Sequence, residues 1–267
     1  MGRPPRLTVS HALALGALQG PTELMPVSSS GHLVLVPALL GWPYTGLDPQ
    51  LKKAFEVALH AGTAAALAIA LRREVAEVVA ELDARRVTRI GVTFLPPALA
   101  GLAFERAIES RLGSARGVAL AQVIAGVALG LADLRPATRG HGDSTLLDAL
   151  LIGLGQAAAL APGVSRNGGT LTAARLRLFE RRAANQLSRH AAMPVILGAS
   201  LLKGIRLARR GMPVEAQLPF AAGAAASFAS TLLSSRLIAE MDGARSYAPF
   251  AAYRVVFGAL ALRRIHA

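Results

Sequence analysis

The sequence lacks cysteine altogether and is poor in aromatic and charged residues. None of its 267 residues is a cysteine, which excludes disulfide bonds, thiolate metal sites and thiol nucleophiles. Aromatic residues make up 4% of the chain, too few for a platform on which nucleic-acid bases stack. Charged residues make up 17%, against about a quarter in an ordinary soluble domain. An ordinary soluble enzyme is therefore not expected.

Apolar residues dominate instead, at 53% of the chain with a mean hydropathy of +0.44. This hydropathy excludes a disordered chain. The net charge of +13 indicates either a nucleic acid or an anionic membrane surface as the partner. Because the basic residues flank apolar runs and form no single soluble face, nucleic acid is excluded. The composition predicts an all-α, polytopic membrane protein, with residues 1–267 forming a single integral membrane domain.

Six apolar segments are candidates for full transmembrane helices. A bilayer core of about 30 Å needs about 20 mostly apolar helical residues. No cleavable signal peptide is expected at the N-terminus, because its apolar run leads into a polar cluster. The six segments are roughly Ala54–Leu71, Ile90–Phe104, Gly117–Leu134, Arg189–Ala208, Leu218–Met241 and Pro249–Leu262.

Two further apolar regions, Leu7–Leu40 and Leu146–Leu178, are interrupted by polar, Pro- and Gly-rich breaks. The breaks cover residues 19–32 and 161–170. Lipid cannot satisfy free backbone N–H groups, so each break must lie inside protein or line a wet cavity. Both regions are therefore interpreted as re-entrant helical hairpins, with surface loops between short helices as the alternative.

The two broken regions resemble each other at one constant offset of 137 residues. The offset relates Gln19, Ser28 and Gly31 to Gln156, Ser165 and Gly168, and it also relates two Arg-Arg pairs. Each half, roughly 1–135 and 136–267, would then hold one hairpin followed by three full spans. Three is an odd number, so the second half enters the membrane from the opposite side. This inverted repeat predicts that the two hairpin tips meet near the middle of the membrane.

The first break carries groups suited to proton transfer and nucleophilic attack. Glu23 follows Gln19 by four residues, so the two side chains share a helix face. A carboxylate in an apolar segment is costly and is by default a functional candidate. Three hydroxyls, a glycine and an imidazole follow at once and offer hydrogen-bond donors, a nucleophile and a proton carrier. These residues are Ser28, Ser29, Ser30, Gly31 and His32.

The second break carries groups suited to binding an anion. Arg166 is always charged and binds phosphate through a planar fork. Neighbouring glycines let backbone N–H groups approach an anion, and the helix that follows has a dipole that favours negative charge. The break reads Ser165-Arg166-Asn167-Gly168-Gly169-Thr170. An acid, a histidine and an arginine that meet around a phosphate predict a phosphoryl-transfer site.

Both breaks resemble signatures of the undecaprenyl-diphosphatase family, the bacitracin-resistance type. Residues 19–32, Gln-Gly-Pro-Thr-Glu-Leu-Met-Pro-Val-Ser-Ser-Ser-Gly-His, are similar to its first signature. Residues 162–170, Pro-Gly-Val-Ser-Arg-Asn-Gly-Gly-Thr, are similar to its second. Residues 55–57 and 250–254 also resemble family landmarks, so the similarity spans nearly the whole chain.

The resemblance implies an integral membrane enzyme that hydrolyses undecaprenyl diphosphate to undecaprenyl phosphate. This reaction recycles the lipid carrier of cell-wall synthesis and confers bacitracin resistance, because bacitracin competes for the substrate. The expected location is the bacterial inner (plasma) membrane, and a homodimer is compatible with the resemblance. The motif match implies Glu23, Ser29, His32 and Arg166 as catalytic residues. The motif match also implies that the remaining polar and glycine residues of the breaks bind substrate. These residues are Gln19, Ser28, Ser30, Gly31, Ser165, Asn167, Gly168, Gly169 and Thr170.

The resemblance also implies a divalent metal, Mg²⁺ or Ca²⁺, with Glu23 as a ligand. Three positions depart from the family pattern: Asn167 replaces a serine, Pro21 lies between Gln19 and Glu23, and Leu187-Ser-Arg-His190 replaces an apolar run. Arg189 and His190 are therefore expected either to line the cavity near the substrate head group or to face a loop. Another pair, Glu56 and His60, is spaced for a hydrogen bond that we interpret as structural.

Two alternatives follow from the same features. Acid-phosphatase-like lipid phosphatases also use Ser-Gly-His and Ser-Arg, but they carry a histidine six residues after the arginine, where this chain has Thr172. That class is excluded. Inverted repeats with facing broken helices are also the architecture of secondary transporters. The alternative function is therefore a flippase that moves a lipid phosphate without hydrolysing it.

Overall fold

The computed structural model describes residues 6–192, 194, 198 and 214–265. Apart from an isolated bridge between Arg139 and Phe179, the regular structure of these residues is helical, as predicted. The residues 181–192 are helical as well, and short 3₁₀ turns lie at Pro43–Gly46 and His141–Asp143. The main helices are α1 (Val9–Leu24), α2 (Ser29–Leu39), α3 (Pro49–Ala70), α4 (Arg72–Ala80), α5 (Ala84–Leu112), α6 (Ala115–Asp133), α7 (Leu146–Ala158), α8 (Arg166–Leu176), α10 (Val214–Leu233), α11 (Arg236–Asp242) and α12 (Ala248–Arg264).

Four helices are long and apolar enough to cross a bilayer: α3, the Ala84–Phe104 part of α5, α6 and α10. They correspond to four of the six predicted spans. The predicted span Leu218–Met241 was wrong at its end, because α10 stops at Leu233 and α11 is a separate helix. The last predicted span, Pro249–Leu262, lies within helix α12, which has 17 residues. Most of the predicted span Arg189–Ala208 lies outside the described residues.

Both breaks are shorter than the sequence predicted. Helix α1 continues through Gln19, Pro21 and Glu23 to Leu24, and α2 begins at Ser29. Helix α7 ends at Ala158, and α8 begins at Arg166. A proline costs a helix one backbone donor, yet Pro21 is tolerated inside α1, near the end of that helix. The polar residues therefore lie on helix ends, where their side chains have fixed directions.

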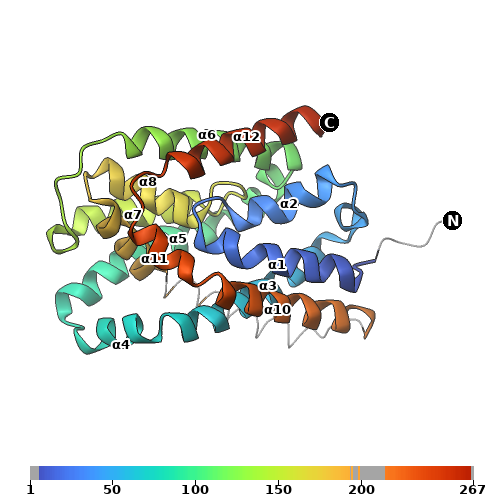
Figure 1. The fold of residues 1–267 in the computed structure, drawn as a ribbon, viewed down its shortest axis with the longest axis horizontal. Helices are drawn as coiled ribbons and strands as arrows, with labels where there is room; N and C mark the ends of the chain where they lie inside the picture. Colours follow the sequence, from blue (N-terminus) through green and yellow to red (C-terminus); the bar gives the residue numbers. More distant parts are fainter. Residues whose placement is uncertain (1–5, 193, 195–197, 199–213, 266–267) are drawn as a thin grey trace.

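The helices of the two halves interlock. In Figure 1, α1 and α2 extend from the end of the molecule where the N-terminus lies, and α7 and α8 occupy the opposite end. Helix α1 packs on α10, and α7 packs on α5. Glycines permit these close contacts, since a Cβ on Gly16 would collide with the carbonyl oxygen of Gly223, and one on Gly153 with that of Thr93. Helices α6 and α12 pack together and cover the two breaks (Figure 1).

A buried carboxylate fixes several of these segments to one another. Asp133, at the end of α6, accepts hydrogen bonds from the Nε atoms of Arg175 and Arg181, at 3.3 and 2.8 Å. It also accepts from the Ser246 hydroxyl and the Tyr247 backbone N–H, just before α12. A buried charge is tolerated only when it is paired in this way. Asp133 therefore orients α6, α8 and α12 around the breaks.

Candidate active site

The first break places a carboxylate beside a hydroxyl. Glu23 lies in the last turn of α1, and Ser29 is the first residue of α2, so the turn between the helices brings the two together. The Ser29 hydroxyl donates to Glu23 Oε2 at 2.6 Å, and Gln19 Nε2 donates to the same oxygen at 3.3 Å. The short distance is typical of a hydroxyl bound to an ionised carboxylate. Glu23 is therefore positioned to withdraw a proton from Ser29.

The second break supplies a positive charge at the same carboxylate. Arg166 is the first residue of α8, and its Nη2 lies 3.0 Å from Glu23 Oε1. Beside it, Asn167 Nδ2 donates to the backbone oxygen of Leu24 at 3.0 Å. These contacts join residues 143 positions apart in the sequence. The predicted meeting of the two breaks is therefore confirmed.

The two breaks share an unusual backbone conformation. Ser28 and Ser165 have positive φ angles of 73° and 71°, which are uncommon for residues other than glycine. Each serine caps the following helix, accepting a hydrogen bond from the backbone N–H of Gly31 or Gly168, respectively. Such strained residues cluster at active sites, where the surrounding structure holds them in place. The two serines are therefore caps that shape the breaks.

A buried arginine in α12 contacts both breaks. The guanidinium of Arg254 donates to the backbone oxygens of Pro26 at 3.2 Å, Gly163 at 2.9 Å and Val164 at 2.7 Å. Its Nε donates to Gln122 Oε1, while Gln122 Nε2 donates to the Val27 oxygen at 2.8 Å. The pair thereby satisfies backbone groups that lipid could not. We call Arg254 and Gln122 the backbone clamp.

No role for Gln122 was predicted from the sequence, and Arg254 was singled out only through the family resemblance. One general signal could have identified Arg254, because a charged residue inside an apolar segment is a functional candidate by default.

Several residues that were predicted to bind substrate make contacts that support the breaks. Gly169 packs against the backbone of Gly155, because a Cβ there would collide with the Gly155 oxygen. Thr170 is fully buried, and its hydroxyl bonds to Ser188 at 2.6 Å. Ser30 approaches the Ser28 hydroxyl at 3.3 Å. Gly169 and Thr170 thus pack against α7 and residues 181–192, and their contact with a substrate stays a prediction.

His32 is engaged away from Glu23. Its Nδ1 lies 2.7 Å from the Ser28 backbone oxygen, so this nitrogen carries a proton. Its Nε2 lies 2.7 Å from the Tyr253 hydroxyl, and its ring stacks on Phe257. The imidazole is 2% exposed, which leaves it little access to a bound substrate. The structure therefore places His32 behind the first break, where it holds the Ser28 backbone.

The imidazole nearest Glu23 belongs to His60. Its Nε2 lies 3.8 Å from Glu23 Oε2, and its Nδ1 donates to the backbone oxygen of Glu56 at 2.8 Å. The predicted hydrogen bond between positions 56 and 60 exists, but it uses the Glu56 backbone. The sequence could not reveal the contact with Glu23, because α1 and α3 meet only in the folded chain.

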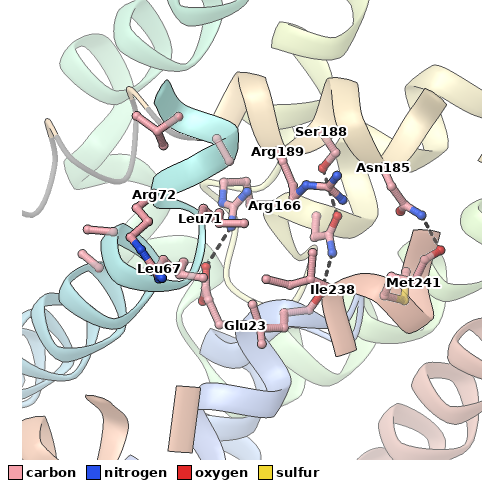
Figure 2. Close-up of a pocket in the computed structure, with 16 residues that line it drawn as sticks. Glu23, Leu67, Leu71, Arg72, Arg166, Asn185, Ser188, Arg189, Ile238 and Met241 are labelled. Carbon is pink, nitrogen blue, oxygen red and sulfur yellow. Dashed lines mark hydrogen bonds and ion pairs between the residues drawn. The ribbon is translucent and has the colours of Figure 1, made fainter. Parts of the chain in front are cut away.

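A cavity of about 270 Å³ opens from the contact between the two breaks (Figure 2). Glu23, Arg166 and Asn167 line it, and the walls from α3, α4 and α11 are mostly apolar. A pocket of this kind, apolar with a few converging polar groups, is typical of a ligand site. Its other polar lining residues are Arg72, Asn185, Ser188 and Arg189.

Arg189 and His190, where the chain departs from the family pattern, form ion pairs beside this cavity. Arg189 contacts Asp242 through both terminal nitrogens, at 2.7 and 3.0 Å, and its Nε approaches both oxygens of Glu74 at 3.1 and 3.2 Å. His190 Nε2 lies 3.3 Å from Glu74. Arg189 thus joins α4, α11 and residues 181–192, and its charge is balanced by two carboxylates.

The oxygen donors at the first break fit a divalent ion only with help from a substrate. In the described residues, no cluster of three or more His, Asp or Glu side chains is suited to a metal. Glu23 and Ser29 offer oxygens, and the buried Oε1 of Gln19 has no hydrogen-bond partner in the described structure. Mg²⁺ is commonly held by one or two carboxylates together with substrate phosphates and water. The donor set is compatible with that mode.

Comparison with known proteins agrees with this geometry. The family model described as "Bacitracin resistance protein BacA" matches residues 12–260. The chain is 40% identical to the undecaprenyl-diphosphatase of Pelobacter propionicus, over 94% of this chain and 95% of that relative. It is 39% identical to the undecaprenyl-diphosphatase of Geobacter sulfurreducens, over 98% of this chain and all of that relative. The joined breaks thus lie in a chain that belongs to the bacitracin resistance protein BacA family.

Proposed function

We propose that this chain hydrolyses undecaprenyl diphosphate to undecaprenyl phosphate and inorganic phosphate, and so recycles the lipid carrier of cell-wall synthesis. The observation that carries the proposal is the contact between Glu23 and Arg166, which joins a base and a phosphate-binding cation in the wall of a largely apolar cavity. The relatives that match nearly the whole chain bear the name of this activity.

The described contacts support a task for each residue in this proposal. Arg166 turns its planar fork from Glu23 to the terminal phosphate and stabilises the charge that spreads over its oxygens. Glu23 then accepts a proton from the nucleophile, either the Ser29 hydroxyl or a water in its place. The nucleophile's oxygen bonds to the terminal phosphorus, and the bond from that phosphorus to the bridging oxygen breaks. If Ser29 attacks, water then hydrolyses the phosphoserine.

A divalent ion, Mg²⁺ or Ca²⁺, is part of the proposal. Glu23, Ser29 and the Gln19 Oε1 atom would hold it together with phosphate oxygens, and the ion would offset their negative charge when bound. Removal of divalent ions with a chelator should abolish most phosphate release, and added Mg²⁺ or Ca²⁺ should restore it. Full activity in excess chelator would contradict a metal requirement.

We further propose an inverted repeat with two re-entrant hairpins inside one membrane domain, with halves at roughly 1–135 and 136–267. Helices α2 and α8 begin and end 137 residues apart, and so do the strained Ser28 and Ser165. Location in the inner membrane, competition by bacitracin and a homodimer are expectations from the family. The transporter alternative gains no support from the named relatives.

The direct test is release of phosphate from undecaprenyl diphosphate by the purified full-length chain. The wild type should release one phosphate per lipid and leave undecaprenyl phosphate. Glu23→Gln, which keeps the shape but loses the base, should lower turnover roughly a hundredfold or more. A wild-type protein that binds the lipid and releases no phosphate would contradict the proposal and favour a flippase.

A further inference from the structure

The cavity contains three arginines, and only part of their charge is balanced by carboxylates. Arg166 faces Glu23, and Arg189 is held by Glu74 and Asp242. Arg72, at the start of α4, lines the same cavity, and its one hydrogen bond runs from Nη1 to the Ile69 backbone oxygen, at 2.9 Å. Within the described residues, Arg72 is therefore the cavity arginine that no carboxylate balances.

Arg72 and Arg166 approach the cavity from different elements. Figure 2 shows Arg72 extending from the start of α4 and Arg166 from the start of α8, with Glu23 between them in this view. Leu67 of α3 and Leu71, the residue after that helix, line the cavity beside Arg72, so charged and apolar groups are neighbours in its wall. This order of groups matches an anionic head group that is attached to an apolar chain.

Charge balance indicates what Arg72 recognises. Arg166 can bind one phosphate, but the carboxylates of Glu23, Glu74 and Asp242 around the cavity disfavour a second negative group unless another cation offsets it. A diphosphate brings two phosphates, and an arginine fork binds each of them well. Arg189 is held by its two carboxylates, so Arg72 is the cation that remains available.

We propose that Arg72 is a specificity-determining residue that binds the second phosphate of a diphosphate while Arg166 binds the first. The inference rests on the proposed function, because it assigns a further residue to the same site. The proposal predicts that the cavity binds two linked phosphates more tightly than a single phosphate, because two arginines on separate helices each bind one of them.

Binding of two simple anions to the purified full-length protein tests this assignment without hydrolysis. Calorimetry would measure the dissociation constants of methylenediphosphonate, which has two linked phosphonates, and of inorganic phosphate. Arg72→Gln should weaken methylenediphosphonate binding about ten- to a hundredfold, the scale of a lost hydrogen bond to a charged group, and change phosphate binding less than twofold. Arg72→Lys should lose less than Arg72→Gln, because it keeps the point charge.

Arg73→Gln is the matched control, since both arginines are exposed but Arg73 lies outside the cavity lining. It should leave both dissociation constants unchanged. The proposal is overturned if Arg72→Gln binds both anions like the wild type, if it weakens both equally, or if Arg73→Gln reproduces the loss. A matching thermal unfolding midpoint shows that Arg72→Gln is folded. If the wild type released no phosphate, the proposed function would fail while this binding result would still stand.

Discussion

At the scale of single residues, the proposed mechanism depends on a cation whose partner changes when the substrate binds. Arg166 contacts Glu23 at 3.0 Å in the described structure, so the two charges compensate each other in the absence of an anion. A phosphate that takes the guanidinium leaves the Glu23 carboxylate with Ser29 and Gln19, and thus free to accept a proton. Substrate binding therefore exposes the base at the moment it is needed.

Replacement of Arg166 tests whether the planar fork matters beyond its charge. Lysine keeps the point charge but loses the two parallel donors. Arg166→Lys should therefore lose most of the phosphate-release activity, and Arg166→Ala should lose more. Steady-state turnover of undecaprenyl diphosphate by the purified variants measures both. Equal turnover of the lysine variant and the wild type would show that only the point charge counts.

Replacement of His32 separates a direct catalytic role from a positioning role. Because its two nitrogens bond to the Ser28 backbone and the Tyr253 hydroxyl, His32→Ala should loosen the first break and lower turnover roughly a hundredfold. Tyr253→Phe keeps the ring but removes the hydroxyl, and should lose much less. If His32 instead transfers a proton, the pH profile of turnover in His32→Asn should lose a limb that the wild type has. A profile of unchanged shape supports the positioning role.

The sequence was sufficient to propose Glu23 and Arg166 as site residues, because a carboxylate and an arginine at breaks in apolar segments have few structural explanations. Ser29 was proposed through the family resemblance. The sequence could not predict that His60, Gln122 and Tyr253 contact residues of the two breaks. These residues lie on apolar helices at ordinary spacing, and they reach the site only through packing between helices that are distant in sequence. The packing contacts of Gly169 and Thr170 could not be predicted for the same reason.

At the scale of elements, the two breaks are held by the backbone clamp. Arg254 bonds to carbonyl oxygens of both breaks, so one side chain fixes the distance between two segments. Gly168 allows this approach, since a Cβ there would collide with Arg254 Nη1. The cost of burying the guanidinium is offset by these carbonyls and by Gln122.

Gly168→Ala tests the clamp. The added methyl group should push the Arg254 guanidinium from its carbonyls, lower turnover at least tenfold and reduce the free energy of unfolding by about 1–3 kcal/mol. Gly101→Ala is the matched control, because it lies in α5 with open space around its Cβ position. The measurements are the rate of phosphate release and the thermal unfolding of both variants, each compared with the wild type. Equal behaviour of the two variants would mean that Gly168 is not under this constraint.

The elements themselves were largely predictable. Hydropathy and length located α3, α5, α6 and α10, and the Pro- and Gly-rich stretches located both breaks. The exact ends were not predictable, because the polar residues 19–24 and 166–170 remain helical when neighbouring segments satisfy them. The separation of α11 from α10 was missed too, because Ser234, Ser235 and Arg236 form only a short polar interruption before apolar residues resume at Leu237.

At the scale of the whole molecule, Arg189 connects three segments around the cavity. It links residues 181–192 to Glu74 in α4 and to Asp242 in α11. Burial raises the pKa of Glu74, but hydrogen bonds and charges from His190 and Arg189 outweigh burial, so the net pKa lies below its ordinary value. Ionised Glu74 therefore stabilises the fold above about pH 4.3, and this contribution is lost as the pH falls through the lowered pKa.

Thermal unfolding at different pH values tests this link. Between pH 7 and pH 3.5 the unfolding midpoint of the wild type should fall more than that of Glu74→Gln, because only the wild type has this carboxylate to protonate. At pH 7 the variant should be the less stable of the two, since it lacks the charged contact to Arg189. Parallel curves would show that Glu74 contributes no stability through its charge.

A double-mutant cycle across the two breaks tests the central claim that they form one hydrolytic site. Phosphate release from undecaprenyl diphosphate would be measured for the wild type, Glu23→Gln, Arg166→Lys and the double variant. Residues that act as a unit are strongly non-additive. We therefore predict that the double variant is scarcely slower than the slower single variant. Losses that multiply, as they do for independent sites, would contradict a site shared by the two breaks.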